Sequence, residues 1–329
     1  MGRIADLPPE EAAAYRSSEQ PPSDFAERWA ATLAEARAVP MVPQVVRVAT
    51  GLSLVASYDV TFPGFGGESV RAWLNVPVGL AGRLPVVVTY NGYGGGRGLP
   101  IEHLVWPSAG YAQLFMDTRG QGSNWGSGGD TPDPHGGGPS GGGFLTRGIE
   151  SFETSYYRRL VTDAVRAVDA ARALPGIDPD RVVVTGISQG GGLTLAVAGL
   201  VDGLAAAMPD VPFLCDFRRA VDVADTDPYL EVSRFLAVQR GAVERAFGTL
   251  AYVDGVHHAA RATAPALFSV ALADRTCPPS TVYAAFNAYG GPASIAAYPF
   301  NDHEGGQAHQ LARQLAWLRD VAGIRPEPA

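Results

Sequence analysis

The segment from Arg181 to Leu200 constrains the fold of this 329-residue chain more than any other. Its apolar, β-branched run from Val182 to Thr185 predicts a buried strand, and the Ala- and Leu-rich run from Leu193 to Leu200 predicts a helix. Between them lies the sequence Gly-Ile-Ser-Gln-Gly, with Ser188 at its centre. In a G-x-S-x-G turn between a strand and a helix, the serine has a strained backbone and an exposed hydroxyl. Ser188 is therefore a candidate nucleophile.

The glycines on either side of the serine have a steric explanation. A side chain at Gly186 or Gly190 would crowd the neighbouring strand or helix. The helix that follows directs its N-terminal amides at the serine, where they stabilise an anion, so the amide of Gln189 is the first candidate donor of an oxyanion hole. The alternative is a glycine-rich turn with an idle serine, which a chain with 40 glycines offers by chance.

A second strand and loop predict the other half of this anion site. The run from Leu84 to Tyr90 is fully apolar, which is typical of a central parallel strand. The glycine-rich loop that follows lets backbone amides approach a ligand closely. In folds built around a serine turn, such an early loop supplies the second oxyanion donor, and we assign that role to the amide of Tyr93. A flexible glycine loop is the alternative.

The candidates for a general base are few, because the chain has six histidines. It has no lysine, which excludes Schiff-base, Ser-Lys and P-loop chemistry. Asp274 follows the apolar run Pro265 to Leu272, and His303 follows the run Ser294 to Tyr298. Open α/β sheets place their chemistry at the carboxyl ends of strands. The order Ser188, Asp274, His303 is that of the α/β-hydrolase triad, which predicts an α/β fold with a mostly parallel central sheet flanked by helices.

Two alternatives near His303 are less favourable. Asp302 adjoins it, but consecutive residues rarely orient one another's side chains, so Asp274 is the preferred acid. The pair His303-Glu304 does not begin a zinc-binding helix, because a second histidine is missing at the required spacing and two glycines follow. We expect no metal and no cofactor.

No Gly/Ser linker or internal repeat divides the chain, so we expect a single domain over residues 1–329. Residues 1–40 are predicted to form an N-terminal helical extension, with an amphipathic helix near Phe25 to Arg37. Helical patterns from about 212 to 260 predict an insertion after the nucleophile and before the acid. This insertion would cover the site as a cap, contact another subunit, or do both.

Other patterns place the surroundings of the site. Alternation from Leu54 to Phe62 and from Val70 to Val76 predicts an antiparallel pair at the edge of the sheet. The pattern from Tyr157 to Leu174 predicts a helix packed on the sheet. The Gly/Pro-rich stretch 123–143 is predicted to be a surface loop near the mouth of the site. Arg119 follows another strand and is expected to hold loops together through its five donors.

The charge and cysteine content limit the partners and the compartment. A net charge of −8 argues against nucleic acid or an anionic membrane as the main partner. The N-terminus has no apolar segment of a secretion signal, and no apolar run is long enough to span a bilayer. The two cysteines, Cys215 and Cys277, do not form a disulfide scaffold, which suits a reducing cytosol. We expect a cytoplasmic protein.

Three blocks in this order resemble the signature of a known family, the acetyl xylan esterases and cephalosporin-C deacetylases of carbohydrate esterase family seven. The blocks are Arg119-Gly-Gln121, Gly186-Ile-Ser188-Gln189-Gly190 and His303-Glu304. Longer matching runs are Asp117 to Gly122, Phe144 to Gly148, Val211 to Cys215 and Cys277 to Thr281. The resemblance extends from about Asp6 to the last helix.

The resemblance implies an esterase that deacetylates small acetylated sugars, xylo-oligosaccharides and cephalosporin C through an acyl-enzyme. It also implies the triad Ser188, Asp274 and His303, with Tyr93 and Gln189 at the oxyanion hole. The motif residues Arg119, Gln121, Gly186, Gly190 and Glu304 then have structural roles near the site. The family further implies that no cofactor is used, that the protein is intracellular, and that it is a homohexamer with sites facing an internal chamber.

The chain departs from the family pattern at a few positions. Asp216 and Asp227 stand where the pattern often has histidine, and the loop from 135 to 143 is altered, which affects the entrance and the size of substrate. A peptidase or a longer-acyl esterase or lipase is the nearest alternative. A non-catalytic scaffold with a hydrolase fold is the other, and a complete triad with two oxyanion loops disfavours it.

Overall fold

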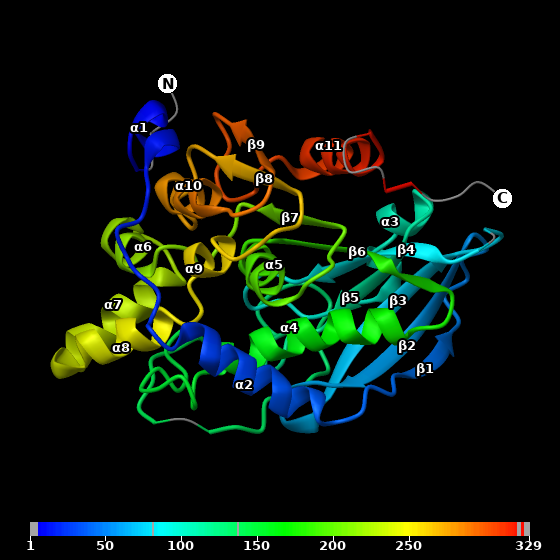
Figure 1. Ribbon diagram of the computed structural model, residues 1–329, viewed down its shortest axis with the longest axis horizontal. Coiled ribbons are helices and arrows are strands. Elements are labelled where there is room, and N and C mark those ends of the chain that lie inside the picture. The colour runs from blue at the N-terminus through cyan, green and yellow to red at the C-terminus, as the bar shows by residue number, and fades with distance from the viewer. Residues whose placement is uncertain (1–5, 81, 137, 321–323, 326–329) are drawn as a thin grey trace.

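The computed structural model describes residues 6–80, 82–136, 138–320 and 324–325 (Figure 1). Within these ranges nine strands form one sheet, in the order β1-β2-β3-β5-β4-β6-β7-β8-β9. The strands from β5 to β9 in this order pair in parallel, whereas β1 with β2, β2 with β3 and β3 with β5 pair antiparallel. The strands are β1 Gln44–Val48, β2 Val55–Pro63, β3 Ser69–Pro77, β4 Leu84–Tyr90, β5 Ala112–Met116, β6 Ile177–Ile187, β7 Ala206–Asp210, β8 Ala266–Ala271 and β9 Ala293–Tyr298.

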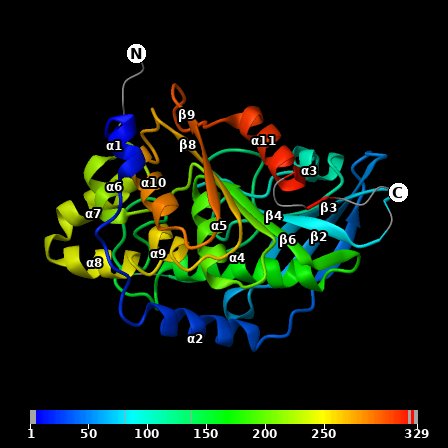
Figure 2. The ribbon, with the colours of Figure 1, turned by 45° about the horizontal axis from the view of Figure 1, so that its top comes forward.

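Helices cover both faces of this sheet (Figure 2). On one face lie α4, α5, α9 and α10, with α2 outside α4, and on the other face lie α3 and α11. The helices are α1 Pro9–Ala14, α2 Phe25–Arg37, α3 Val105–Ser108, α4 Tyr156–Ala173, α5 Gln189–Leu200, α6 Phe217–Val223, α7 Tyr229–Val238, α8 Val243–Leu250, α9 Gly255–Ala259, α10 Pro279–Ala288 and α11 Gln307–Asp320.

The central strands are apolar on both faces because both faces are covered. In β4, Val86 and Val88 pack in the larger core with α4, whereas Val87 packs in the smaller core with Trp106 of α3 and Leu318 of α11. These side chains alternate between the two faces, as the pleat of a strand requires. The continuous apolar run from Leu84 to Tyr90 is therefore a doubly buried parallel strand, as the sequence predicted.

The predicted mostly parallel α/β sheet is confirmed, and two details differ from the prediction. The antiparallel pair β2 and β3 forms as expected, but it does not lie at the edge, because β1 adds a further strand outside β2. The side chains of β1 are mostly exposed, so its short sequence lacks the alternation that marks a half-buried strand. Helix α5 also begins at Gln189, earlier than the predicted Leu193, because three glycines at its start mask the helical pattern.

The segment from 212 to 260 is mostly helical, as predicted, and contains α6, α7, α8 and α9. Helices α6, α7 and α8 gather at the end of the molecule opposite β1 (Figure 1). Before them in the chain, α2 has the predicted bounds Phe25–Arg37, and the short helix α1 precedes it.

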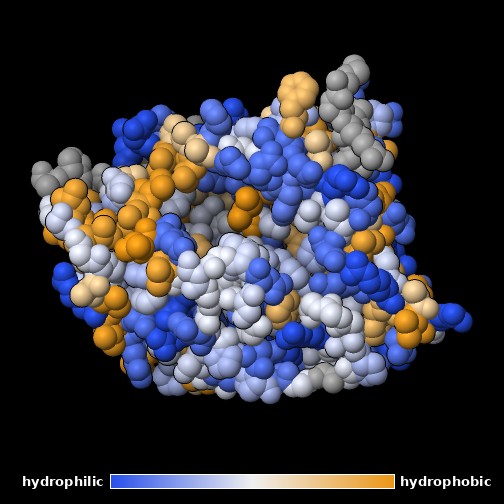
Figure 3. Space-filling model, turned by 180° about the vertical axis from the view of Figure 1, so that it is seen from behind, coloured by the Kyte–Doolittle hydropathy of each residue, from blue (hydrophilic) through white to orange (hydrophobic). Residues whose placement is uncertain are grey.

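Polar residues cover most of the face shown in Figure 3, and apolar residues gather mainly toward one side of it. Among the described residues, the large apolar side chains with high exposure include Val46, Leu54 and Val105. None of the helices in the described ranges has the length and the apolar character needed to cross a membrane.

Candidate active site

The turn between β6 and α5 holds Ser188 in a strained conformation. Its φ is 58° and its ψ is −119°, a left-handed backbone that non-glycine residues rarely adopt. The Ser188 N–H donates to the carbonyl of Asp210 at 3.0 Å, and the Ser188 carbonyl accepts the N–H of Phe213 at 2.9 Å. The end of β7 and the chain just after it thus hold the turn through both backbone groups of Ser188.

Close packing explains the glycines of this turn. A Cβ at Gly186 would lie 2.5 Å from the backbone of Gly190, and a Cβ at Gly190 would lie 2.1 Å from the carbonyl oxygen of Tyr90. Neither backbone contact can yield without moving a central strand or helix α5. The steric reason predicted for both glycines is confirmed.

Three distant segments bring Ser188, His303 and Asp274 together. His303 Nε2 lies 2.9 Å from Ser188 Oγ, and His303 Nδ1 lies 2.9 Å from Asp274 Oδ2. Asp274 follows β8 and His303 follows β9, so both side chains come from the carboxyl ends of parallel strands. This edge of the sheet also carries the serine turn, which is the arrangement that the order of the three residues predicted.

The carboxylate of Asp274 is fixed by backbone donors. Its side chain is 1% exposed, and Oδ1 accepts the N–H groups of Thr276 and Cys277 at 2.8 Å each. Oδ2 is left to face the imidazole. Asp302, the alternative acid, accepts the backbone N–H of His303 through Oδ1 and does not orient the ring.

Asp274 changes the pKa of His303. Burial disfavours the charged imidazolium, but the hydrogen bond and charge of Asp274 outweigh burial and raise the pKa of His303 above its ordinary value. A carboxylate accepts hydrogen bonds only, so Nδ1 carries the proton and Nε2 accepts the hydroxyl hydrogen of Ser188. The ring is therefore placed to remove a proton from the serine.

Gln121 connects the two segments that carry the candidate oxyanion donors. Among the described residues, the backbone N–H groups of Tyr93 and Gln189 donate to no protein acceptor. Gln121 Oε1 accepts the N–H of Gly94 at 2.6 Å, and Gln121 Nε2 donates to the side-chain oxygen of Gln189 at 3.0 Å. Gln121 thus ties the loop after β4 to the start of α5. The sequence marked this residue only as part of a motif, since the contact spans 68 residues.

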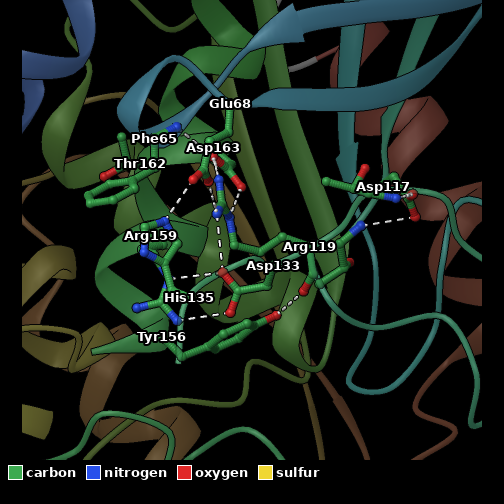
Figure 4. A network of polar contacts seen from close by, with 12 residues as sticks. Phe65, Glu68, Asp117, Arg119, Asp133, His135, Tyr156, Arg159, Thr162 and Asp163 are labelled. Atoms are coloured by element: carbon green, nitrogen blue, oxygen red, sulfur yellow. Dashed lines mark hydrogen bonds and ion pairs between the residues drawn. The ribbon is translucent and has the colours of Figure 1, made fainter. Parts of the chain in front are cut away.

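Arg119 is the centre of a buried ion network (Figure 4). Its guanidinium forms two hydrogen bonds with the carboxylate of Asp163 on α4, and Nη1 donates to Glu68 at 2.7 Å and lies near Asp133 at 3.3 Å. Its backbone carbonyl accepts the hydroxyl of Tyr156 at 2.6 Å. Arg119 therefore holds the loop after β5 against α4, which agrees with the structural role expected from its donors.

A cavity of about 680 Å³ opens in front of Ser188 and His303. The loop predicted at 123–143 contributes Trp125 and the glycines 141–143 to its wall. The helical segment from 212 to 260 contributes Asp227, Pro228, Glu231 and Arg234. Sequence reasoning named neither Trp125 nor Glu231. A lone tryptophan in a Gly/Ser-rich loop was a signal that could have indicated Trp125. No local pattern indicates Glu231.

The other residues singled out by the sequence lie around this centre. Asp216 is buried, accepts the hydroxyl of Tyr15 at 3.0 Å, and has its pKa raised to about 6, chiefly by burial. Asp227 pairs with Arg234 at 2.8 Å on the pocket wall. Glu304 is exposed and accepts a hydrogen bond from Asn301.

One group among the described residues has the spacing of a metal site. It consists of Asp274, Cys277 and His303, whose ligand atoms lie within 4.8 Å of one another. Both oxygens of Asp274 already accept N–H groups, and His303 bonds to two partners. This donor set fits proton transfer between side chains better than metal ligation.

The topology, with the serine turn between β6 and α5 and the acid and base at later strand ends, is that of an α/β hydrolase. A solved structure of low identity shares this fold. Acylaminoacyl peptidase of Pyrococcus horikoshii is 16% identical, with a TM-score of 0.61 over 85% of this chain and 43% of its own.

The chain belongs to the acetyl xylan esterase (AXE1) family, whose sequence profile matches residues 2–321. The acetyl xylan esterase of Paenibacillus sp. R4 is 36% identical, with a TM-score of 0.88 over 94% of this chain and 98% of its own. Acetyl xylan esterase 1 of Thermoanaerobacterium sp. JW/SL YS485 is 30% identical, with a TM-score of 0.86 over the same shares. The family resemblance inferred from the sequence blocks is confirmed.

A curated relative is similar over a shorter stretch. Acetyl esterase Axe7A of Xylanibacter ruminicola is 31% identical over 178 residues, which are 54% of this chain. The match spans 39% of the length of that relative.

Proposed function

We propose that this protein is a serine esterase that removes acetyl groups from small acetylated sugars, including xylo-oligosaccharides, and from cephalosporin C. The observation that carries the proposal is the position of His303, which lies 2.9 Å from both Ser188 Oγ and Asp274 Oδ2. Membership of the acetyl xylan esterase family supports acetyl esters as the substrate class.

The proposed reaction has two halves. His303 removes the proton of Ser188 as Oγ attacks the acetyl carbonyl, while Asp274 holds the ring and stabilises the imidazolium. The amides of Tyr93 and Gln189 stabilise the oxyanion, and one such donor is worth about 3 kcal/mol. The C–O bond of the ester then breaks as His303 gives its proton to the departing sugar oxygen, and water, activated by the same ring, releases acetate from the acyl-serine.

The pocket is consistent with a sugar substrate. Trp125 is half exposed on its wall, and the wall also contains the acidic and basic side chains of Asp227 and Arg234. These groups offer hydrogen bonds to the hydroxyls of a sugar. We extend the proposal, on the family resemblance, to a cytoplasmic homohexamer.

The test compares acetyl, butyryl and octanoyl esters of one alcohol, with Ser188→Ala as the control. We expect the acetyl ester to have the highest kcat/KM and the Ser188→Ala variant to lose turnover. A preference for the octanoyl ester would overturn the acetyl-specific proposal in favour of a lipase. Unchanged turnover in the variant would overturn the nucleophile.

A further inference from the structure

Glu231, on helix α7 of the insertion, connects three parts of the pocket wall. Its side chain is buried, with 7% of the residue exposed. Oε1 accepts the hydroxyl of Tyr93 at 2.5 Å, and Oε2 accepts the N–H of Leu145 at 3.1 Å. The N–H of Phe144 donates to the hydroxyl oxygen of Tyr93. One carboxylate thus joins the insertion, the loop after β4 and the chain just beyond the glycines at 141–143.

The absence of a side chain at Gly143 leaves room for this carboxylate. Gly143 has a φ of +89°, and a Cβ there would lie 1.9 Å from Glu231 Oε1. The Tyr93 ring packs edge-on against Phe144, with 5.3 Å between ring centroids, and against Phe213, with 6.0 Å. The hydroxyl of Tyr93 therefore has little freedom, and its partner carboxylate fills the space that a side chain at 143 would need.

Burying a carboxylate here is costly. Burial raises the pKa of the Glu231 carboxyl above its ordinary value, against the opposing effect of the hydrogen bond from Tyr93. Burial also raises the pKa of Tyr93 well above its ordinary value, so the phenol stays protonated and donates. The carboxylate is thus held by a residue whose own backbone amide is a proposed oxyanion donor.

We infer that Glu231 is a positioning residue for the oxyanion hole. It accepts the hydrogen bond of the Tyr93 hydroxyl and so fixes the Tyr93 backbone amide relative to Ser188. This inference rests on the proposed esterase function. An oxyanion donor acts only when it is aimed at the charge that develops in the transition state, and a misplacement of about 1 Å costs about 100-fold in rate. The insertion, through Glu231, therefore contributes to the rate as well as to the wall of the pocket.

The test uses Glu231→Gln, Tyr93→Phe and the double variant with 4-nitrophenyl acetate. Glutamine at 231 keeps the volume of the side chain but places an NH₂ group against either the Tyr93 hydroxyl or the Leu145 N–H. Phenylalanine at 93 keeps the backbone amide and removes only the hydroxyl. We expect each single variant to lower kcat by roughly 10- to 100-fold with KM changed less than about 3-fold, because the interaction strengthens in the transition state. The double variant should lose no more than the worse single variant, since both break one linkage.

The matched control is Tyr15→Phe. Tyr15 also donates its hydroxyl to a buried carboxylate, that of Asp216, at 3.0 Å, but neither residue lines the pocket. We expect its kcat to stay at the wild-type value. A boronic acid that forms a tetrahedral adduct with Ser188 adds a second readout, because its inhibition constant should rise in proportion to the loss of kcat/KM in the Glu231 and Tyr93 variants. A purely structural role would lower the unfolding temperature without this proportionality.

The outcomes separate the two proposals. An active wild type with unchanged kcat in Glu231→Gln or Tyr93→Phe overturns the positioning role alone, as do fully additive losses in the double variant. A wild type without ester turnover overturns the proposed function and this inference with it. Should Glu231→Gln fail to fold, the kcat and the boronic acid affinity of Tyr93→Phe decide the matter.

Discussion

Replacing Arg119 by methionine should destabilise the fold strongly, because it removes the counter-charge of a buried carboxylate. Asp163 is fully buried and receives two hydrogen bonds from the guanidinium, and it would keep only the weaker support of the Phe65 N–H. Removing one partner of a buried ion pair costs about 3–5 kcal/mol. At about 2.1 cal/mol/K per residue, a 329-residue chain has an unfolding entropy of about 0.7 kcal/mol/K, so Tm should fall by about 4–7 °C.

Thermal unfolding, followed by calorimetry or circular dichroism, measures this change. The matched control is Arg37→Met, since Arg37 pairs with Asp169 at 3.0 Å but is 42% exposed, and such a pair is worth about 1 kcal/mol or less. Burial already raises the pKa of Asp163, and loss of the guanidinium should raise it further. The Arg119 variant should therefore regain part of its stability as pH falls and the carboxyl takes up a proton. Equal Tm losses in the two variants, or no recovery at lower pH, would refute this reasoning.

Three further predictions concern the site. The rate of ester hydrolysis should fall as pH is lowered through the His303 pKa, because only the neutral ring accepts the serine proton. The midpoint of the pH profile of kcat/KM should lie above about 6.5. A profile that stays flat down to about pH 4 would contradict His303 as the base. Asp274→Asn should lower kcat about 10⁴-fold, because the amide favours the wrong imidazole tautomer, and Asp302→Asn serves as the control that should lose far less. Gly190→Ala should yield little folded protein, since its Cβ would lie 2.1 Å from a β4 carbonyl; a soluble variant with wild-type circular dichroism would argue against the steric reason.

The parts of the fold that local patterns encode were predictable. Strand β4 and helix α2 have the predicted bounds, because a doubly buried strand and an amphipathic helix each carry their environment in their own residues. The triad was predictable in a different way. Each member follows a strand end, and parallel strands bring their carboxyl ends to one edge, so chain order and position together placed Ser188, Asp274 and His303 near one another.

The rest depends on contacts that no local pattern encodes. Strand β1 was missed because its exposed side chains give no alternation, and its place is set by pairing with β2. Gln121 and Glu231 bind partners 68 and 138 residues away, so their roles follow only from the packed structure. The glycines at the start of α5 argue against a helix by propensity, yet Gly191 and Gly192 are required by close contacts with the chain after β7.

The identity of the nucleophile is tested by trapping the covalent intermediate. Wild-type protein is mixed with an activated acetyl ester and quenched in acid within the first turnovers, and the digested peptides are examined by mass spectrometry. We predict one acetyl group on the peptide that contains Ser188, its loss when the quench is delayed until the ester has been consumed, and its absence in Ser188→Ala. An acetyl group on another residue, or continued turnover in Ser188→Ala, would contradict the mechanism.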